Sequence, residues 1–320
     1  MAKLLAVGVV LLVLAGPVGA QIDPAMYALV HQLSLIQGPP SSQAGRGGAG
    51  VAVPEPWGGN PAAMQARAAT ALQVHSYSFK NGMDASLVSL AAVYPTGRWD
   101  FVLSWAELNS TRGSLPAPGL ALDLRESDLS VQVGYRVNEH LTLGIGAAPA
   151  MDVRMHVSSP LGQVAELSSR PKLGYRVGGL WEIGDGWSVG GVYDNYLEEV
   201  KLQMTGAPLA QHSYRSEIGR YGVAKRLGRW LLAADHYRGR VFGAPSVGRC
   251  DDWMYGADYE MSPAWTVRGG FNNRQPSVGF AYRSRRLIAD YAFVKNISDD
   301  ELHAALRGSS THAVTLSYTF

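Results

Sequence analysis

The feature that most limits how this chain can fold is a two-residue alternation of side-chain polarity that recurs from residue 71 to the last residue. In VQVGYRV (131–137) every odd position is apolar, and every even position is polar or glycine. Successive side chains of a β-strand point to opposite faces, so such a segment predicts a strand with one apolar and one polar face. The repetition of this pattern predicts an all-β protein.

The alternation predicts fourteen antiparallel strands, most of them about the 9–11 residues that a tilted membrane-spanning strand needs. They lie near 71–79, 84–95, 98–108, 127–137, 141–153, 171–183, 187–201, 213–227, 229–241, 251–261, 264–272, 276–284, 286–296 and 311–320.

The connections between these segments fall into two sets that alternate along the chain. One set is tight and reads PTGR, NEH, GDG, GR, SP and RSR. The other set is mostly longer, at 109–126, 154–170, 202–212, 242–250 and 297–310, with short members at 80–83 and 273–275. Short turns on one side and long loops on the other are typical of outer-membrane β-barrels, and an even strand count returns both chain ends to one side.

Side-chain chemistry supports a transmembrane barrel. Tryptophans are predicted near the short turns, where an aromatic girdle would meet the lipid headgroups. They are Trp99, Trp181, Trp187, Trp230, Trp253 and Trp265. The opposite face suits a wet lumen and carries Arg176, Arg215, Lys225, Asp235, Arg268, Asn272 and Asp290.

Both ends of the chain indicate export to a bacterial outer membrane. Residues 1–20 have a lysine, an apolar run and the small residues VGA, which predict a signal peptide and a mature start near Gln21. The last segment places Val314, Leu316, Tyr318 and Phe320 on one face. Tyr318 and the terminal Phe320 look like the signal that the barrel-assembly machinery recognises, although an edge strand of a secreted sandwich would also fit.

Residues 21–70 do not alternate. Asp23 as N-cap, Pro24 at the first helical position and Gly38 after the end predict a short helix. One apolar stripe on this helix contains Met26, Leu29, Val30, Leu33 and Ile36. We expect residues 21–70 to form a helical and coil plug in the lumen of a barrel formed by residues 71–320, with a periplasmic domain as the alternative.

The stretch GRGGAG (45–50) has the glycine spacing of a dinucleotide-binding loop. That loop requires a strand before it and a helix opening at its last glycine. Here QGPPSSQA precedes the glycines, and Pro54 and Pro56 follow them. The glycines are therefore expected to serve close backbone packing or positive φ angles rather than a cofactor.

In combination, AGRGGAGVAVPEP and NPAAM resemble the N-terminal hatch of the FadL family of hydrophobic-compound transporters and its PorV-type relatives. The corresponding residues are Gly45, Gly47, Gly48, Ala49, Asn60, Pro61 and Ala62. The resemblance implies fourteen strands and a plug. Arg46 departs from the methionine usual in the family, and we expect it to pair with a lumen carboxylate such as Asp290 or Glu217.

No group of residues predicts catalysis or a bound metal or cofactor. GWSVG (186–190) has the spacing of a serine-hydrolase elbow, but Ser188 opens a strand rather than a helix. Asp235 and His236 are neighbours in a strand and cannot share a face. The net charge of +2 comes without a basic tract, which argues against nucleic acid, and the single Cys250 excludes an internal disulfide.

Three functions follow as hypotheses. The first is passive uptake of hydrophobic compounds such as fatty acids, in contact with outer-membrane lipids and with the 26–36 stripe as a ligand contact. That stripe could equally serve only to pack the helix. The second is a PorV-like docking subunit that binds a protein through the loops 109–126, 154–170 and 297–310. The third is a structural or enzymatic barrel.

Overall fold

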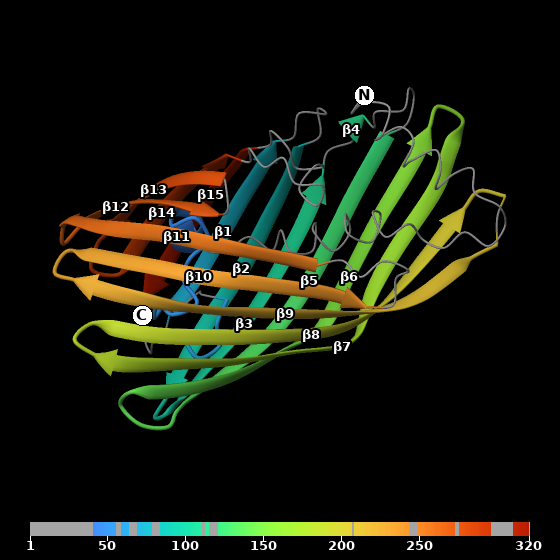
Figure 1. Ribbon diagram of the computed structural model, residues 1–320. Coiled ribbons are helices and arrows are strands. Elements are labelled where there is room, and N and C mark those ends of the chain that lie inside the picture. Colours follow the sequence, from blue (N-terminus) through green and yellow to red (C-terminus); the bar gives the residue numbers. More distant parts are fainter. Residues whose placement is uncertain are drawn as a thin grey trace.

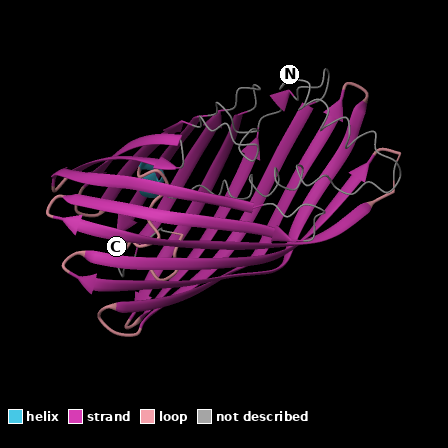
Figure 2. Cartoon of the chain, in the orientation of Figure 1, coloured by secondary structure: helices cyan, strands magenta, loops and turns pink. Residues whose placement is uncertain are grey.

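The computed structural model describes residues 41–55, 59–63, 69–78, 84–110, 113–114, 121–206, 208–242, 249–272, 275–295 and 310–319. The predicted signal peptide, the 26–36 stripe and Phe320 lie outside these residues. Nearly all of the described chain is antiparallel β-sheet, as predicted (Figure 2). One short helix, α3 (Ser41–Gly45), precedes the strands. Among the described residues, no helix is both long and apolar enough to cross a membrane.

Fourteen long strands and one two-residue strand are present among the described residues. They are β1 (Ala69–Ser78), β2 (Asp84–Thr96), β3 (Trp99–Ser110), β4 (Gly113–Ser114), β5 (Ala121–Arg136), β6 (Leu141–Ser159), β7 (Gly162–Gly184), β8 (Trp187–Met204), β9 (Ala210–Leu227), β10 (Trp230–Phe242), β11 (Arg249–Ser262), β12 (Trp265–Asn272), β13 (Gln275–Arg283), β14 (Leu287–Lys295) and β15 (Ser310–Thr319).

The strand pairing returns to its starting point. β1 pairs with β15 on one side and with β2 on the other, and the order continues without a crossover from β15 back to β5. β3 pairs with both β2 and β5, so the two ends of the row meet (Figure 1). β4 adds only two residue pairs to β5. A sheet joined in this way leaves no long unpaired edge.

Six short connections gather at one end of the sheet, which we call the turn end. They are 97–98, 137–140, 185–186, 228–229, 263–264 and 284–286. We call the opposite end the loop end, and the two halves of the sheet the turn half and the loop half. β5–β9 are 16–23 residues long, whereas β12–β15 are 8–10 residues long, so the loop half is built mainly from β5–β9.

Two of the predicted long loops are strand for much of their length. β6 and β7 run up to a tight turn at 160–161, so the prediction of a loop over 154–170 is wrong. β5 likewise begins at Ala121, inside the predicted loop 109–126. The alternation continues through both segments, but β-bulges between Leu129 and Val131 and between Pro171 and Leu173 shift the register there. An extra residue in one strand moves the following side chains to the other face, which hides the strand from a fixed pattern.

In the turn half, the outer face is apolar. Its exposed side chains include Trp99, Leu103, Ile145, Val177, Trp181, Trp187, Val189, Trp230, Trp265 and Phe280. The predicted tryptophans thus lie near the turns with one exception. Trp253 is exposed on the outer face but lies near the loop-end start of β11, because β11 begins at Arg249 and runs to its turn after Ser262.

The predicted polar face is only partly luminal. Asp235 and Asp290 are buried on the inner face, where Arg176 and Arg268 form ion pairs. Lys225 instead pairs in register with Trp187 on the outer face, where its Nζ lies 4.8 Å from the Trp187 ring centroid. Arg215 is on the outer face as well, at the loop end of β9, so the prediction of a luminal position is wrong for Lys225 and Arg215.

Candidate functional site in the barrel interior

The described part of the N-terminal segment, 41–55 and 59–63, lies inside the ring of strands in the turn half (Figure 1). α3 contacts β12–β15. Inner-face glycines make room for the rest of the segment: a Cβ on Gly144 or Gly178 would collide with Pro61 or Asn60. We call residues 41–55 and 59–63 the inner segment.

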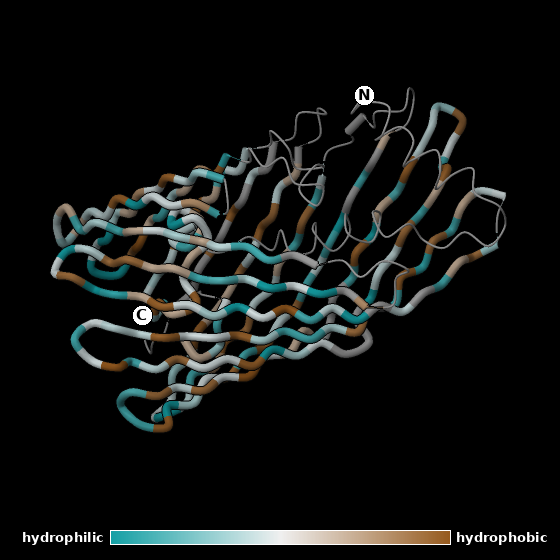
Figure 3. The backbone as a smooth tube through the Cα atoms, in the orientation of Figure 1, coloured by the Kyte–Doolittle hydropathy of each residue, from teal (hydrophilic) through white to brown (hydrophobic). Residues whose placement is uncertain are grey.

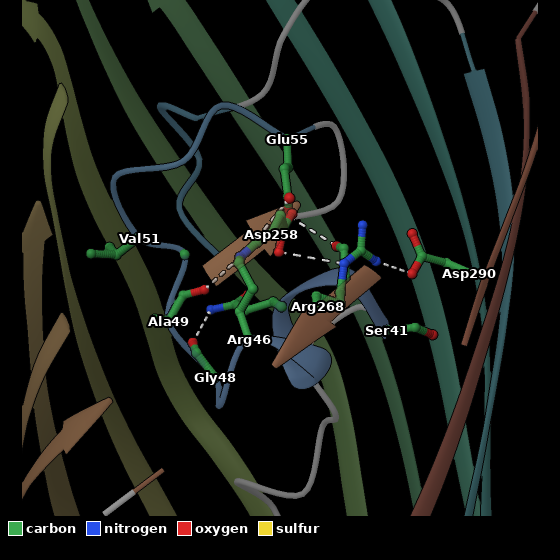
Figure 4. A network of polar contacts seen from close by, with 12 residues as sticks. Ser41, Arg46, Gly48, Ala49, Val51, Glu55, Asp258, Arg268 and Asp290 are labelled. Atoms are coloured by element: carbon green, nitrogen blue, oxygen red, sulfur yellow. Dashed lines mark hydrogen bonds and ion pairs between the residues drawn. The ribbon is translucent and has the colours of Figure 1, made fainter. Parts of the chain in front are cut away.

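Arg46 is the most deeply buried charged group of the inner segment, with no exposed surface. Its guanidinium is 2.7 Å from Glu55 Oε1 and 2.8 Å from Asp258 Oδ2 on β11, and its Nε donates to the Ala49 carbonyl at 3.1 Å (Figure 4). Burial alone would lower the pKa of Arg46, but the carboxylates of Glu55 and Asp258 outweigh it and hold that pKa above its ordinary value. Arg46 is therefore a permanently charged link between the inner segment and the barrel wall.

The chain of charges continues along the wall. Arg268 Nε on β12 is 3.5 Å from Asp258, and Arg268 also forms an ion pair with Asp290 on β14 (Figure 4). The expectation that Arg46 pairs with a lumen carboxylate is correct in kind. Its partner is Asp258 rather than Asp290, which is held by Arg268, or Glu217, which lies on the outer face opposite Arg240.

A second anchor binds the glycine loop through its backbone. Asp235 Oδ2 on β10 accepts from the amides of Gly50 at 2.8 Å and Val51 at 2.9 Å. The same carboxylate oxygen forms an ion pair with Arg220 on β9, 2.6 Å from its Nη2. Consecutive amides that share one carboxylate fix the path of the loop, and a nearby guanidinium compensates for the buried charge.

The residues of the family resemblance are brought together here. Gly45 and Gly47 bind one hydroxyl, because Ser277 Oγ donates to the Gly45 carbonyl and accepts from the Gly47 amide. Gly47 has φ 68°, and a Cβ there would collide with the Phe271 backbone. Arg220 donates to the Gly48 carbonyl.

The NPA stretch closes the other end of the inner segment. Asn60 Nδ2 donates to the Val51 carbonyl at 2.8 Å and to the Gly179 carbonyl on β7 at 3.1 Å, while its Oδ1 accepts from the Ala62 amide at 3.0 Å. Pro61 lies against Gly144 and Gly178, and Ala62 packs with Ala63 and Leu180. Ala49 packs with Ala52 and Leu231.

The two catalytic motifs considered in the sequence have other roles in the structure. Ser188 is buried and donates to the Ala52 carbonyl at 2.7 Å, so it is a further anchor of the inner segment. Asp235 faces inward, whereas His236 lies on the outer face between Tyr221 and Trp253. Nowhere in the described ranges do three His, Cys, Asp or Glu side chains come together as a metal would require.

In the loop half, the inner face changes character from polar to apolar. Met155 on β6, Leu167 on β7 and Leu202 on β8 are paired in one row across three strands and are each at most 4% exposed. We call the surrounding buried set the apolar wall. It consists of Val153, Met155, Val157, Ala165, Leu167, Val200 and Leu202.

The outer face changes from apolar in the turn half to charged in the loop half. Arg154 alternates with the wall residues of β6, and Lys201 alternates with those of β8; both are exposed. Asp152 Oδ2 lies 2.9 Å from Arg154 Nη2, and Asp152 Oδ1 lies 3.3 Å from Arg170 Nε, so this surface carries charges of both signs. Sequence reasoning missed the apolar wall, although VKLQM (200–204) already shows apolar residues in the phase that is polar near Trp187.

No protein-family model matches the sequence, and no curated protein matches it either. Solved structures do share the fold. The toluene transporter TbuX of Ralstonia pickettii matches with a TM-score of 0.60 at 15% identity, over 89% of this chain and 99% of that one. The monoaromatic hydrocarbon channel CymD matches with a TM-score of 0.63 at 16% identity, over 88% and 98%.

A FadL homologue of Pseudomonas aeruginosa matches with a TM-score of 0.60 at 15% identity, over 88% of this chain and 98% of that one. At these identities the comparison shows a shared fold over nearly the whole length of those proteins. The resemblance first stated for about twenty hatch residues is thus matched by structural neighbours of the FadL family along most of the chain.

Proposed function

We propose that this protein is an outer-membrane channel for the passive uptake of hydrophobic compounds rather than an enzyme. In this proposal residues 1–20 are a removed signal peptide, 21–70 form a hatch, and 71–320 form a transmembrane barrel of fourteen strands. Tyr318 and Phe320 would guide insertion by the barrel-assembly machinery. The inner segment is the part of the hatch that supports this view, because its buried charges hold it across the lumen.

The observation that carries the proposal is the reversal of polarity between the two halves. A water-filled pore requires a polar interior. Here the loop-half interior places Met155, Leu167 and Leu202 in one buried row. Apolar side chains that line a concave interior favour an apolar ligand, because binding removes apolar surface of both from water.

The apolar outer face of the turn half, which we call the apolar belt, has the height expected of a membrane-spanning region. On β7 the outer face is apolar around Trp181 and becomes charged at Arg170, eleven residues away. At about 3.3 Å per residue and a tilt of about 40°, those residues rise by roughly 28 Å, close to the height of a bilayer's apolar band. The loop half would then project above the outer leaflet, where a compound in the medium first meets the protein.

The substrate class follows from the wall and from the similar structures. The wall is built of aliphatic and methionine side chains, which adapt to apolar ligands of different shape. TbuX is described as a toluene transporter and CymD as a monoaromatic hydrocarbon channel. We therefore include aromatic hydrocarbons beside fatty acids. The stripe of Met26, Leu29, Val30, Leu33 and Ile36 remains a proposed second ligand contact.

The test compares two buried, inward-facing residues. Leu167→Asn places an amide in the middle of the wall, whereas Val102→Asn places one beside Val93 in the turn half. Native mass spectrometry of gently extracted protein is expected to show a retained hydrophobic molecule in the wild type and in V102N, and its loss in L167N. Equal retention in both variants would show that the apolar wall does not bind the hydrophobic molecule.

The docking hypothesis is a distinct outcome of the same measurement. A protein bound in stoichiometric amount, with no hydrophobic molecule in any preparation, would replace uptake by a docking function. The contacts would then involve 109–126, 297–310 or the outer surface of the 154–170 hairpin. Uptake of a labelled hydrocarbon by cells that make the wild-type protein, but not by cells that make L167N, would instead establish the channel.

A further inference from the structure

The tight turn between β13 and β14 concentrates positive charge at the turn end. It reads RSRR (283–286), and Arg283, Arg285 and Arg286 are all exposed. We call residues 283–286 the arginine turn. Because the three guanidinium groups start from neighbouring backbone positions, their fields add at the surface beside them and attract anions.

The backbone of the arginine turn is held on both sides. The Arg283 amide donates to the Ala264 carbonyl at 2.8 Å, in the turn between β11 and β12. On the other side, the Arg286 carbonyl accepts from the Thr319 amide of β15 at 2.8 Å, and Arg286 Nη1 donates to the Tyr318 hydroxyl at 3.4 Å. The three charges are therefore presented from fixed positions on the barrel rim.

The neighbouring strands supply almost no negative charge. β12, β13, β15 and β1 contain no aspartate or glutamate, and β14 contains only Asp290. Asp290 is buried on the inner face and forms an ion pair with Arg268. Glu260, near the end of β11, is 3.0 Å from Arg226. Within the described chain, no ion pair involves the arginine turn, so its charge is open to an anion from outside.

The outer face beside the turn is aromatic and apolar. Four consecutive strands contribute one residue each, and these residues are 40–47% exposed: Trp265, Tyr282, Leu287 and Tyr318. The rings of Trp265 and Tyr282 are 5.0 Å apart. Amphipathic rings of this kind favour the level of the lipid headgroups. The arginine turn thus lies at the end of the apolar belt, where lipid phosphates would be when acyl chains cover the belt.

We propose that the arginine turn binds the phosphates of an anionic phospholipid and prefers cardiolipin, whose two phosphates engage more than one arginine. A guanidinium binds phosphate oxygens through two parallel hydrogen bonds. Clustered basic residues at a membrane surface also select anionic over zwitterionic lipids. The inference rests on the proposed membrane orientation, in which the turn end meets the periplasmic leaflet, and is independent of what the loop half binds.

The test is competitive lipid binding to the purified full-length protein. The protein is incubated with equimolar cardiolipin, phosphatidylglycerol and phosphatidylcholine, and native mass spectrometry gives the ratios of the complexes. The wild type should retain cardiolipin over phosphatidylglycerol, and both over phosphatidylcholine. The variant Arg283→Gln/Arg285→Gln/Arg286→Gln should lower the ratio of cardiolipin to phosphatidylcholine at least about tenfold, since each basic group near the lipid contributes about fivefold.

The matched control is Arg98→Gln/Arg226→Gln/Arg229→Gln. It removes three exposed arginines from two other turns at the same end, so the change in net charge is the same. The ratio should stay close to that of the wild type. An equal loss in the two variants would show that the whole turn end attracts anionic lipid without a site, and would overturn the proposal.

A double variant protects the test against a folding effect. Because Arg286 also contacts the last strand, Arg283→Gln/Arg285→Gln probes the site with that contact intact, and it should still lower the ratio severalfold. Unchanged ratios in both arginine-turn variants, or a wild type without preference for cardiolipin, would overturn the lipid site and leave the uptake proposal standing. A stoichiometric protein bound through the arginine turn, with no phospholipid, would also overturn it.

Discussion

The two halves of the barrel have opposite patterns of polarity. In the turn half the outer face is apolar, and the interior holds Arg46, Asp235, Asp258 and Asp290. The alternation of hydrophobic and hydrophilic residues along the strands can be followed in Figure 3. In the loop half the outer face carries Arg154 and Lys201, while the interior contains the apolar wall. The first arrangement suits a sheet surrounded by lipid, and the second is that of a sheet surrounded by water with an apolar interior. In the proposed orientation, one continuous set of strands therefore passes from lipid into water along its length.

The difference also separates two kinds of interaction. The inner segment is held in the turn half by buried ion pairs and backbone hydrogen bonds, which require fixed positions. The apolar wall depends on non-directional burial of surface, which tolerates ligands of different shape. We therefore propose that the turn half closes the lumen and that the loop half binds the ligand, and the following variants test that division.

The largest effect is expected from Arg46→Met. The substitution leaves the buried Asp258 and the half-buried Glu55 without the cation between them, which should cost about 3–5 kcal/mol of unfolding free energy. It should also loosen the inner segment and raise ion conductance across a planar bilayer. Urea unfolding and single-channel recording give the two results.

The double variant Arg46→Met/Asp258→Asn also removes the charge of Asp258, one of the two carboxylates that lose Arg46, and should recover part of the lost stability. Wild-type stability and conductance in R46M alone would show that the charge network does not hold the inner segment.

A smaller effect is expected on the outer face. Val177→Lys places a charge in the apolar belt and should cost about 2–4 kcal/mol when the protein unfolds from lipid vesicles. Gln203→Lys makes the same type of change on the outer face of the loop half and should alter stability by no more than about 0.5 kcal/mol. Equal costs at the two positions would mean that both surfaces meet the same solvent.

The smallest effect is expected from Ser188→Ala. It removes the hydroxyl that donates to the Ala52 carbonyl and leaves that buried acceptor unpaired, at a cost of about 1 kcal/mol. Ser213→Ala on the exposed outer face of β9 serves as the control. A change in S188A no greater than in S213A would exclude this contact as an anchor.

The turn half could be predicted from the sequence because its alternation keeps one phase. The strand positions and the tryptophans near the turns follow from that pattern, apart from Trp253. The loop half could not be predicted in the same way. Register shifts near Leu129 and Pro171 and the exchange of polar and apolar faces reverse which phase is apolar, so the pattern predicts a loop over 154–170.

For the candidate site, the sequence likewise indicates what a local motif encodes but not what depends on tertiary placement. The hatch motif identified Gly45–Ala49 and Asn60–Ala62, and the need of Arg46 for a carboxylate followed from its burial in a lumen. Which carboxylate it meets depends on how the inner segment is placed against β11, and no local pattern encodes that position. The apolar wall likewise exists only once the register aligns Met155, Leu167 and Leu202.

The most direct test of the central claim is a crystal structure of the protein soaked with a brominated hydrocarbon. We expect an anomalous bromine peak inside the loop half, against Met155, Leu167 and Leu202. Bromine peaks confined to the outer face of the turn half, with none against the wall, would contradict it.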